Sequence, residues 1–264
     1  MTHGWAGPSL ERLCELARRD QWRLEDLGWS TVDVSALPES FRQTAAEAFV
    51  QLQCGEQTAL FAATRLREWL PEGSARAFLA TQQTDEARHV AFFERVVGIF
   101  GCEGRVRPSV ARLMREVREA DTPEALLLGM QVLIEGVAHS LFQEAVRLVE
   151  TLDDGEGLDS SIRALKTLVA EALPRLARDE SRHIAFGLHS LRQRIPRLDG
   201  AARLRLEEKV ALWGEWLLEQ VRDPDLIVGI GMDGGAVCER LLEDINLRIA
   251  QVGLHTRLAP LKAA

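Results

Sequence analysis

The chain has 264 residues, 46% hydrophobic and 27% charged, which is the composition of an ordinary water-soluble globular protein. Its formal net charge of -8 argues against a nucleic-acid surface, because phosphate binding needs concentrated positive charge. No apolar run approaches a membrane span, no secretion signal is evident, and the four cysteines lack metal-site or disulfide-framework spacing. We therefore expect one domain over 1–264, located in the cytoplasm, with no nucleic-acid or membrane partner.

The predicted elements are all helices, because strong helix formers dominate the chain and no useful period-2 segment occurs. A short amphipathic helix precedes a Trp-containing connection, and four long helices then follow, the second and third separated by a short one. In chain order we predict helices at 9–20, 39–70, 73–100, 108–119, 123–152, 158–195, 199–221 and 235–251. We also expect Pro174 to kink or break the fourth long helix.

Short connections join the first long helix to the second, and the third to the fourth. Two antiparallel hairpins of this kind predict an all-α fold built on a four-helix bundle at about 40–195. The extra helices at 9–20, 199–221 and 235–251 then flank the bundle.

The motif Asp-Glu-x-Arg-His occurs twice, at 85–89 and 179–183. Six of eight aligned residues are identical between 85–92 and 179–186. Each copy places a glutamate and a histidine three residues apart, which puts both side chains on one helix face. Two such copies within apolar stripes predict a two-metal site, with these ligands from the second helix of each hairpin: Glu86, His89, Glu180 and His183.

The other two long helices should each add a carboxylate. Glu56 occupies an apolar-face position 15 residues before Pro71, and Glu86 lies 15 residues after it, so an antiparallel turn there brings them level. A second turn near 155–157 similarly pairs Glu135 with Glu180. We predict Glu56 and Glu135 as the remaining ligands.

Four buried carboxylates favour bound cations, because each would cost several kcal/mol if ionised and unpaired. Two divalent cations balance four negative charges. Oxygen-rich ligation with one imidazole per metal suits iron or manganese better than structural zinc. The sequence therefore predicts two iron ions, or a Mn/Fe pair, as the cofactor.

Asp85 and Asp179 precede the motif glutamates. A metal-bound histidine usually donates its second N–H to a carboxylate, and by the internal symmetry Asp179 would support His89 and Asp85 would support His183. The alternative is a plain salt bridge from each aspartate to the arginine of its own motif.

The six ligands and the paired motif resemble the ligand set of the ferritin-like dinuclear-iron carboxylate proteins. The segment RDESRHIAFG at 178–187 looks closest to the branch that contains ribonucleotide reductase small subunits and the related ligand-binding oxidases. The resemblance covers about 40–195. It implies a ferritin-like bundle in which dioxygen is activated at a dimetal centre and a bound organic molecule is oxidised.

The chain departs from that pattern in having no tyrosine. Reductase small subunits commonly place a radical tyrosine four residues after the first histidine, where this chain has Phe93. A tyrosyl radical and a tyrosine ether crosslink are both excluded.

His139 lies one helical turn after Glu135, where related oxygenases often place a polar side chain. We consider it a catalytic candidate, either as a proton donor in the pocket or as a further ligand. The alternative is a partly exposed histidine bonded to a neighbour.

The leading functional prediction is a non-haem dimetal oxidase or oxygenase, a homodimer that takes a small organic substrate, dioxygen and electrons from a donor. Its reaction could be hydroxylation, N-oxygenation, desaturation or oxidative cleavage. We expect an apolar pocket beside the metals, lined by Phe49, Leu52, Ala59, Phe93, Phe142 and Phe186. One alternative is a ferroxidase or iron-handling protein, which a cage-sized assembly would distinguish. Another is a non-catalytic bundle held by structural ion pairs.

Overall fold

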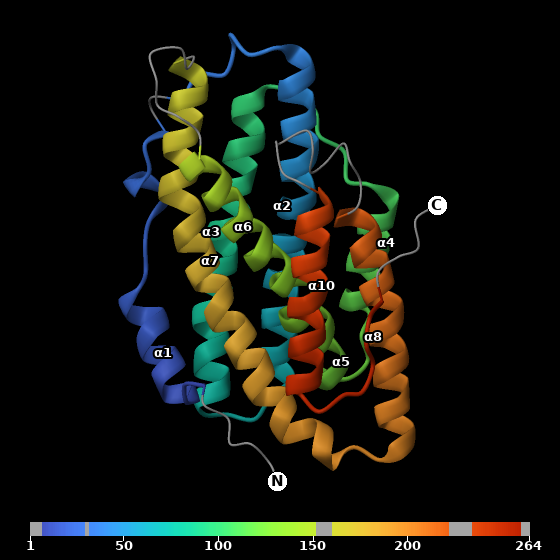
Figure 1. Cartoon of the computed structure of the whole chain (residues 1–264). Coiled ribbons are helices and arrows are strands. Elements are labelled where there is room, and N and C mark those ends of the chain that lie inside the picture. The colour runs from blue at the N-terminus through green and yellow to red at the C-terminus, as the bar shows by residue number, and fades with distance from the viewer. Residues whose placement is uncertain (1–6, 30–31, 152–159, 222–233, 260–264) are drawn as a thin grey trace.

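The computed structural model describes residues 7–29, 32–151, 160–221 and 234–259, and these ranges contain helices and no strand (Figure 1). The all-α prediction is therefore confirmed. The central helices are α2 (Glu39–Trp69), α3 (Ser74–Phe100), α6 (Glu135–Thr151) and α7 (Ser160–Arg194). The outer and shorter helices are α1 (Leu10–Arg19), α4 (Pro108–Arg118), α5 (Pro123–Leu127), α8 (Gly200–Val221) and α10 (Gly234–Gln251).

Two helical hairpins form the bundle, since α2 packs along α3 and α6 packs along α7. The first hairpin turns at Pro71, as predicted, and α3 begins directly after Gly73. Gly73 has φ +123°, a conformation that favours glycine because other residues meet steric strain there. The turn predicted near 155–157 lies outside the described residues. The bundle predicted for about 40–195 is confirmed in its helices.

The third long helical segment of the bundle, predicted at 123–152, is less regular than expected. Instead of one α-helix from 123 onward, a π-helix, Leu128–Ile134, lies between α5 and α6. Gly129 in this π-helix lies directly against the buried indole of Trp213 on α8, where an added Cβ would come within 2.8 Å of the ring. π-Helical turns are wider than α-helical turns and occur often at functional sites. Here the π-helix ends immediately before Glu135.

The outer helices cover the bundle on several sides. α1 packs on α3 and α7, whereas α8 and α10 pack on the π-helix, with α10 also reaching α6 (Figure 1). The connection after α1 carries Trp22 and Trp29, each 7% exposed, so this segment contributes core side chains.

Two further expectations concern the long helices. α7 continues through Pro174 as one helix, so the proline does not break it. The apolar stretch Pro123–Thr151 is long enough to cross a membrane, but 83% of its most apolar window is buried within the described part of the fold. Its composition is therefore explained by its central place in the bundle.

Candidate metal centre

The six predicted ligands converge in the middle of the bundle from four different helices. They form two overlapping groups in which the possible ligand atoms lie within 4.8 Å of one another. Glu86 and Glu180 belong to both groups and would bridge two cations. The first group adds Glu56 and His89, which we call the His89 position. The second adds Glu135 and His183, which we call the His183 position.

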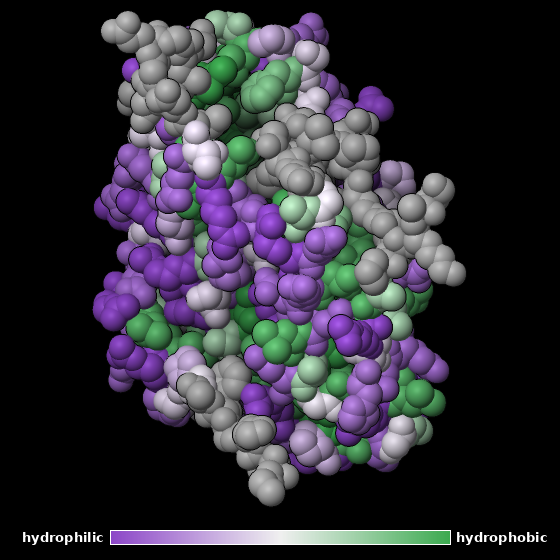
Figure 2. Space-filling model, in the orientation of Figure 1, coloured by the Kyte–Doolittle hydropathy of each residue, from purple (hydrophilic) through white to green (hydrophobic). Residues whose placement is uncertain are grey.

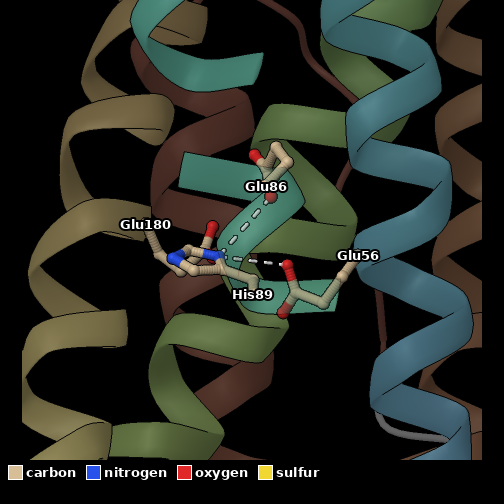
Figure 3. A group of neighbouring side chains, drawn as sticks. All are labelled: Glu56, Glu86, His89 and Glu180. Carbon is tan, nitrogen blue, oxygen red and sulfur yellow. Dashed lines mark hydrogen bonds and ion pairs between the residues drawn. The ribbon is translucent and has the colours of Figure 1, made fainter. Parts of the chain in front are cut away.

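Both histidines present Nδ1 to the glutamates. Figure 3 shows His89 on α3 between Glu56 on α2 and Glu180 on α7. Its Nδ1 lies 3.2 Å from Glu56 Oε2 and 3.1 Å from Glu180 Oε1. His183 Nδ1 lies 3.1 Å from Glu86 Oε1 and 3.4 Å from Glu180 Oε2. Each imidazole therefore faces carboxylates of its own position.

The donor atoms in the centre are buried and several lack hydrogen bonds. All six side chains are at most 5% exposed. Among the described residues, five of their atoms have no hydrogen-bond partner: Glu86 Oε2, Glu135 Oε2, Glu180 Oε1, Glu180 Oε2 and His183 Nδ1. Buried polar atoms normally have partners, so this concentration at one point needs an explanation. Two divalent cations would satisfy these atoms and balance four carboxylates, so the residues fit a dimetal centre.

The electrostatics of these side chains also favour cations. Burial, followed by the charge of Glu180, raises the pKa of Glu56 to about 8. Burial also raises the pKa of Glu135 well above its usual value. Burial acts to lower the pKa of His89, but the carboxylates of Asp179, Glu180 and Glu56 outweigh it and raise that pKa well above its usual value. Protons thus compete with metal for this site.

The two aspartates lie behind the histidines in the crossed arrangement that the symmetry predicted. His89 Nε2 is 3.2 Å from Asp179 Oδ2, and His183 Nε2 is 3.4 Å from Asp85 Oδ2. Hydrogen bonds to Nε2–H fix the tautomer that leaves Nδ1 free to bind metal. Burial acts to raise the pKa of Asp179, but His89 and then Arg182 hold it below its usual range.

The alternative prediction, salt bridges from the aspartates, is also borne out. Arg88 donates to Asp85 and, at 3.0 Å, to Asp179 Oδ2. Arg182 donates to Asp179 Oδ1 at 2.6 Å and to Asp85 Oδ2 at 3.2 Å. Each arginine joins both aspartates, so the ion pairs and the histidine contacts coexist in one buried network.

Sequence reasoning missed four residues of this surrounding layer. Trp22 Nε1 donates to Asp179 Oδ2 at 2.8 Å, and Gln21 Nε2 donates to Asp85 Oδ1 at 2.9 Å. Gln82 donates to two of the glutamates, and Gln131 donates to Gln82. Gln82 lies one turn before Glu86, a spacing that could have indicated it, whereas the other three carry no signal in the sequence.

An elongated apolar cavity of about 410 Å³ ends at the centre. Glu56, Glu135 and Glu180 form part of its wall, so it opens onto both metal positions. Almost all other lining residues are hydrophobic. Several of them have small side chains or none, which leaves the cavity volume unfilled: Ala45, Ala48, Gly55, Ala59, Ala138 and Ala145. The cavity extends toward the starts of α2 and α7, the end of the bundle where Figure 2 shows hydrophobic side chains gathered at the surface.

Four of the six predicted pocket residues line this cavity: Phe49, Leu52, Ala59 and Phe142. Phe93 and Phe186 do not line it and are buried elsewhere in the core. Phe93 lies behind the wall, with its ring 6.2 Å from Phe49 and 6.0 Å from Phe142. Phe186 instead stacks on Phe78 at 4.7 Å, on the side of His183.

His139 belongs to neither ligand group among the described residues, and it does not line the apolar cavity. It lines a separate, more open hollow between α6 and α7 and lies 3.4 Å from the amide of Gln143. Burial, followed by Arg248, lowers the pKa of His139, and its Nδ1 is buried without a hydrogen bond in the described structure. The contact with Gln143 is the one expected of a histidine that is simply bonded to a neighbouring side chain. A catalytic role for His139 stays a prediction.

Comparison with family models and with curated proteins finds no match to this sequence. Several solved structures share its fold. An R2-like ligand-binding oxidase with an anaerobically reconstituted Mn/Fe cofactor is 21% identical over 96% of each chain, with a TM-score of 0.72. A variant with an aerobically reconstituted Fe/Fe cofactor is 20% identical over 96% of each chain, with a TM-score of 0.65. The chain therefore has the ferritin-like helical fold of these oxidases, as the resemblance implied.

Proposed function

We propose that this protein is a non-haem dimetal oxidoreductase, with an Fe/Fe or Mn/Fe pair, that uses dioxygen to oxidise an apolar organic molecule. One observation carries the proposal: buried donor atoms without hydrogen bonds converge beside an apolar cavity whose wall includes Glu56, Glu135 and Glu180. The solved structures with the same fold hold Mn/Fe or Fe/Fe cofactors, which supports this choice of metals.

The chain's own residues would bind and orient both components. Glu56, Glu135 and Glu180 line the cavity and also belong to the ligand groups, so a molecule in the cavity would lie beside the metals. The apolar wall excludes water from that molecule and strengthens electrostatic interactions at the centre. A bound metal pair would supply the redox chemistry with dioxygen, and an external electron donor would restore its reduced state.

The lining favours oxidation of a hydrocarbon group. Near the centre the cavity offers hydrophobic side chains and the ligand glutamates, with few other polar groups to orient an amine. Among the reactions expected from the sequence, hydroxylation or desaturation of a carbon chain therefore fits this cavity better than N-oxygenation does.

The alternatives fit the geometry less well. A ferroxidase must admit hydrated iron, whereas the cavity that ends at this centre has an apolar wall. A purely structural bundle would pair its buried glutamates with arginines, but Arg88 and Arg182 pair with the aspartates, and the glutamates face the two imidazoles instead. Among the glutamate oxygens of the described structure, Glu86 Oε2, Glu135 Oε2 and both oxygens of Glu180 accept no hydrogen bond.

The proposal is tested by loading the protein anaerobically, either with Fe²⁺ alone or with Mn²⁺ and Fe²⁺ together, and measuring its metal content. The loaded protein is then exposed to dioxygen. We expect two metal ions per chain and a transient visible absorption that decays faster with a long-chain apolar compound present. Glu56→Ala should lower the metal content, whereas Glu68→Ala, on the exposed side of α2, should not. Metal content near zero in the unsubstituted protein would overturn the proposal.

A further inference from the structure

A buried chain of hydrogen bonds, from Gln131 through Gln82 to the glutamates, distinguishes the His183 position from the His89 position. Gln82 and Gln131 are each 1% exposed. Gln82 Nε2 donates to Glu86 Oε1 at 3.0 Å and to Glu135 Oε1 at 2.9 Å. Gln131 Nε2, from the π-helix, donates to Gln82 Oε1 at 3.0 Å. In this orientation the Gln82 amide gives one donor to each of the two carboxyl groups.

Gln82 contacts the His183 position through Glu135, whereas Glu86 belongs to both positions and its Oε2 lies 3.5 Å from His89 Nδ1. Glu135 belongs to that position alone, and Glu86 Oε1 is the oxygen 3.1 Å from His183 Nδ1. The second oxygens of these glutamates, Glu86 Oε2 and Glu135 Oε2, are left without hydrogen bonds in the described structure. Gln82 thus occupies one oxygen of Glu135 and leaves the other for a metal ion.

The internal repeat has no equivalent of this chain at the His89 position. The residue that matches Gln82 in the second motif is Leu176, which cannot donate a hydrogen bond. The amide chain is also held in place by packing, because Gly187 on α7 lies against Gln131. A Cβ at Gly187 would come within 2.7 Å of Gln131 Cβ, and the matching residue of the first motif is Phe93.

We propose that Gln82, held by Gln131, is a positioning residue that selectively stabilises metal binding at the His183 position by fixing Glu135 for ligation through its free oxygen. The proposal rests on the dimetal centre proposed above. Removing the amide leaves two buried carboxylate oxygens without donors in the metal-bound state, which destabilises that state. Rotation of the freed carboxylates relieves part of that cost in the metal-free state, so binding itself weakens.

Anaerobic Mn²⁺ titration of Gln82→Leu tests the proposal without any turnover, with electron paramagnetic resonance separating single Mn²⁺ ions from coupled pairs. We expect one ion to bind within threefold of the unsubstituted affinity, and the other to bind about 10- to 100-fold more weakly. The coupled-pair signal should therefore form only at higher Mn²⁺. Gln83→Leu is the matched control, because Gln83 is adjacent on α3 but bonds to Arg67 and Thr64, away from the centre.

Anomalous scattering from crystals of Gln82→Leu at limiting Mn²⁺ locates the retained ion. An ion beside His89 supports the proposal, and an ion beside His183 overturns it. Equal weakening of both steps, or no weakening of either, also overturns it while leaving the dimetal centre intact. If the unsubstituted protein binds no Mn²⁺ and no Fe²⁺, the proposed function itself has failed.

Gln131→Leu provides a second variant, because it removes the donor to Gln82 without touching a glutamate. Gln82 is then free to rotate, and we expect the same step to weaken by a smaller factor than in Gln82→Leu. An effect on the His89 position alone would contradict the proposed chain.

Discussion

The crossed pairing of aspartates and histidines predicts that each aspartate controls the opposite motif's metal position. Asp179→Asn keeps the shape of the side chain but removes the charge beside His89 Nε2, 3.2 Å away. Loss of a carboxylate partner typically weakens metal binding 10- to 100-fold, or about 1.4–2.7 kcal/mol. The loss should fall on the His89 position. Asp85→Asn, the matched variant, should weaken the His183 position by a similar factor.

Asp179→Asn should also destabilise the metal-free protein. Removing one partner of a buried ion pair typically costs about 3–5 kcal/mol. Asp85 still contacts both arginines of the network, so we expect the lower end of that range. For a chain of this size, a loss of about 3 kcal/mol lowers the midpoint of thermal unfolding by roughly 6–12 °C.

Anaerobic Co²⁺ titration, followed by visible absorption, measures the two binding steps, and circular dichroism measures the thermal midpoint. The control is Asp199→Asn, which changes a carboxylate far from the centre, at the start of α8. The crossed assignment is refuted if Asp179→Asn and Asp85→Asn weaken the same position, as located by crystallography. It is also refuted if neither variant changes Co²⁺ affinity.

Four further predictions follow from the same site. Because the pKa of Glu56 is raised to about 8, its contribution to the stability of the metal-free protein is complete below about pH 4.5 and lost as pH rises through 8. Metal affinity should rise between about pH 4.5 and 8, because protons leave Glu56 and Glu135 as metal binds. Calorimetry in buffers of different ionisation enthalpy should detect the released protons, and metal binding without proton release would contradict this expectation. Ala48→Phe should fill part of the cavity and weaken binding of an apolar fluorescent probe at least tenfold with unchanged metal content; unchanged probe binding would place the ligand elsewhere. Trp22→Phe removes a donor to the Asp179 carboxylate and should cost about 2 kcal/mol in chemical unfolding, an expectation that equal stability would disprove.

The helices and the convergence of the six candidate ligands could be predicted because both depend on local spacing. The Glu-x-x-His repeat sets two ligands per motif on one helix face, and the distance to Pro71 places Glu56 beside Glu86. The symmetry of the repeat was also enough to cross Asp85 with His183.

Features that depend on contacts between distant segments could not be predicted in this way. The π-helix before Glu135 accompanies close packing of Gly129 on Trp213, 84 residues later in the chain. Phe93, four residues after His89, was expected to line the pocket, but Phe49 and Phe142 come between it and the cavity. An inward-facing position does not say which layer of the interior a side chain occupies.

The functional unit of this protein starts earlier in the chain than the residues that would bind metal. Trp22 donates a hydrogen bond to Asp179 and Gln21 donates one to Asp85, both from the segment between α1 and α2, outside the bundle. A chain shortened to residues 39–194 would retain every ligand and both aspartates but would expose the layer behind the imidazoles to water. Transferring this centre to another protein scaffold would therefore require the segment between α1 and α2 as well as the four long helices.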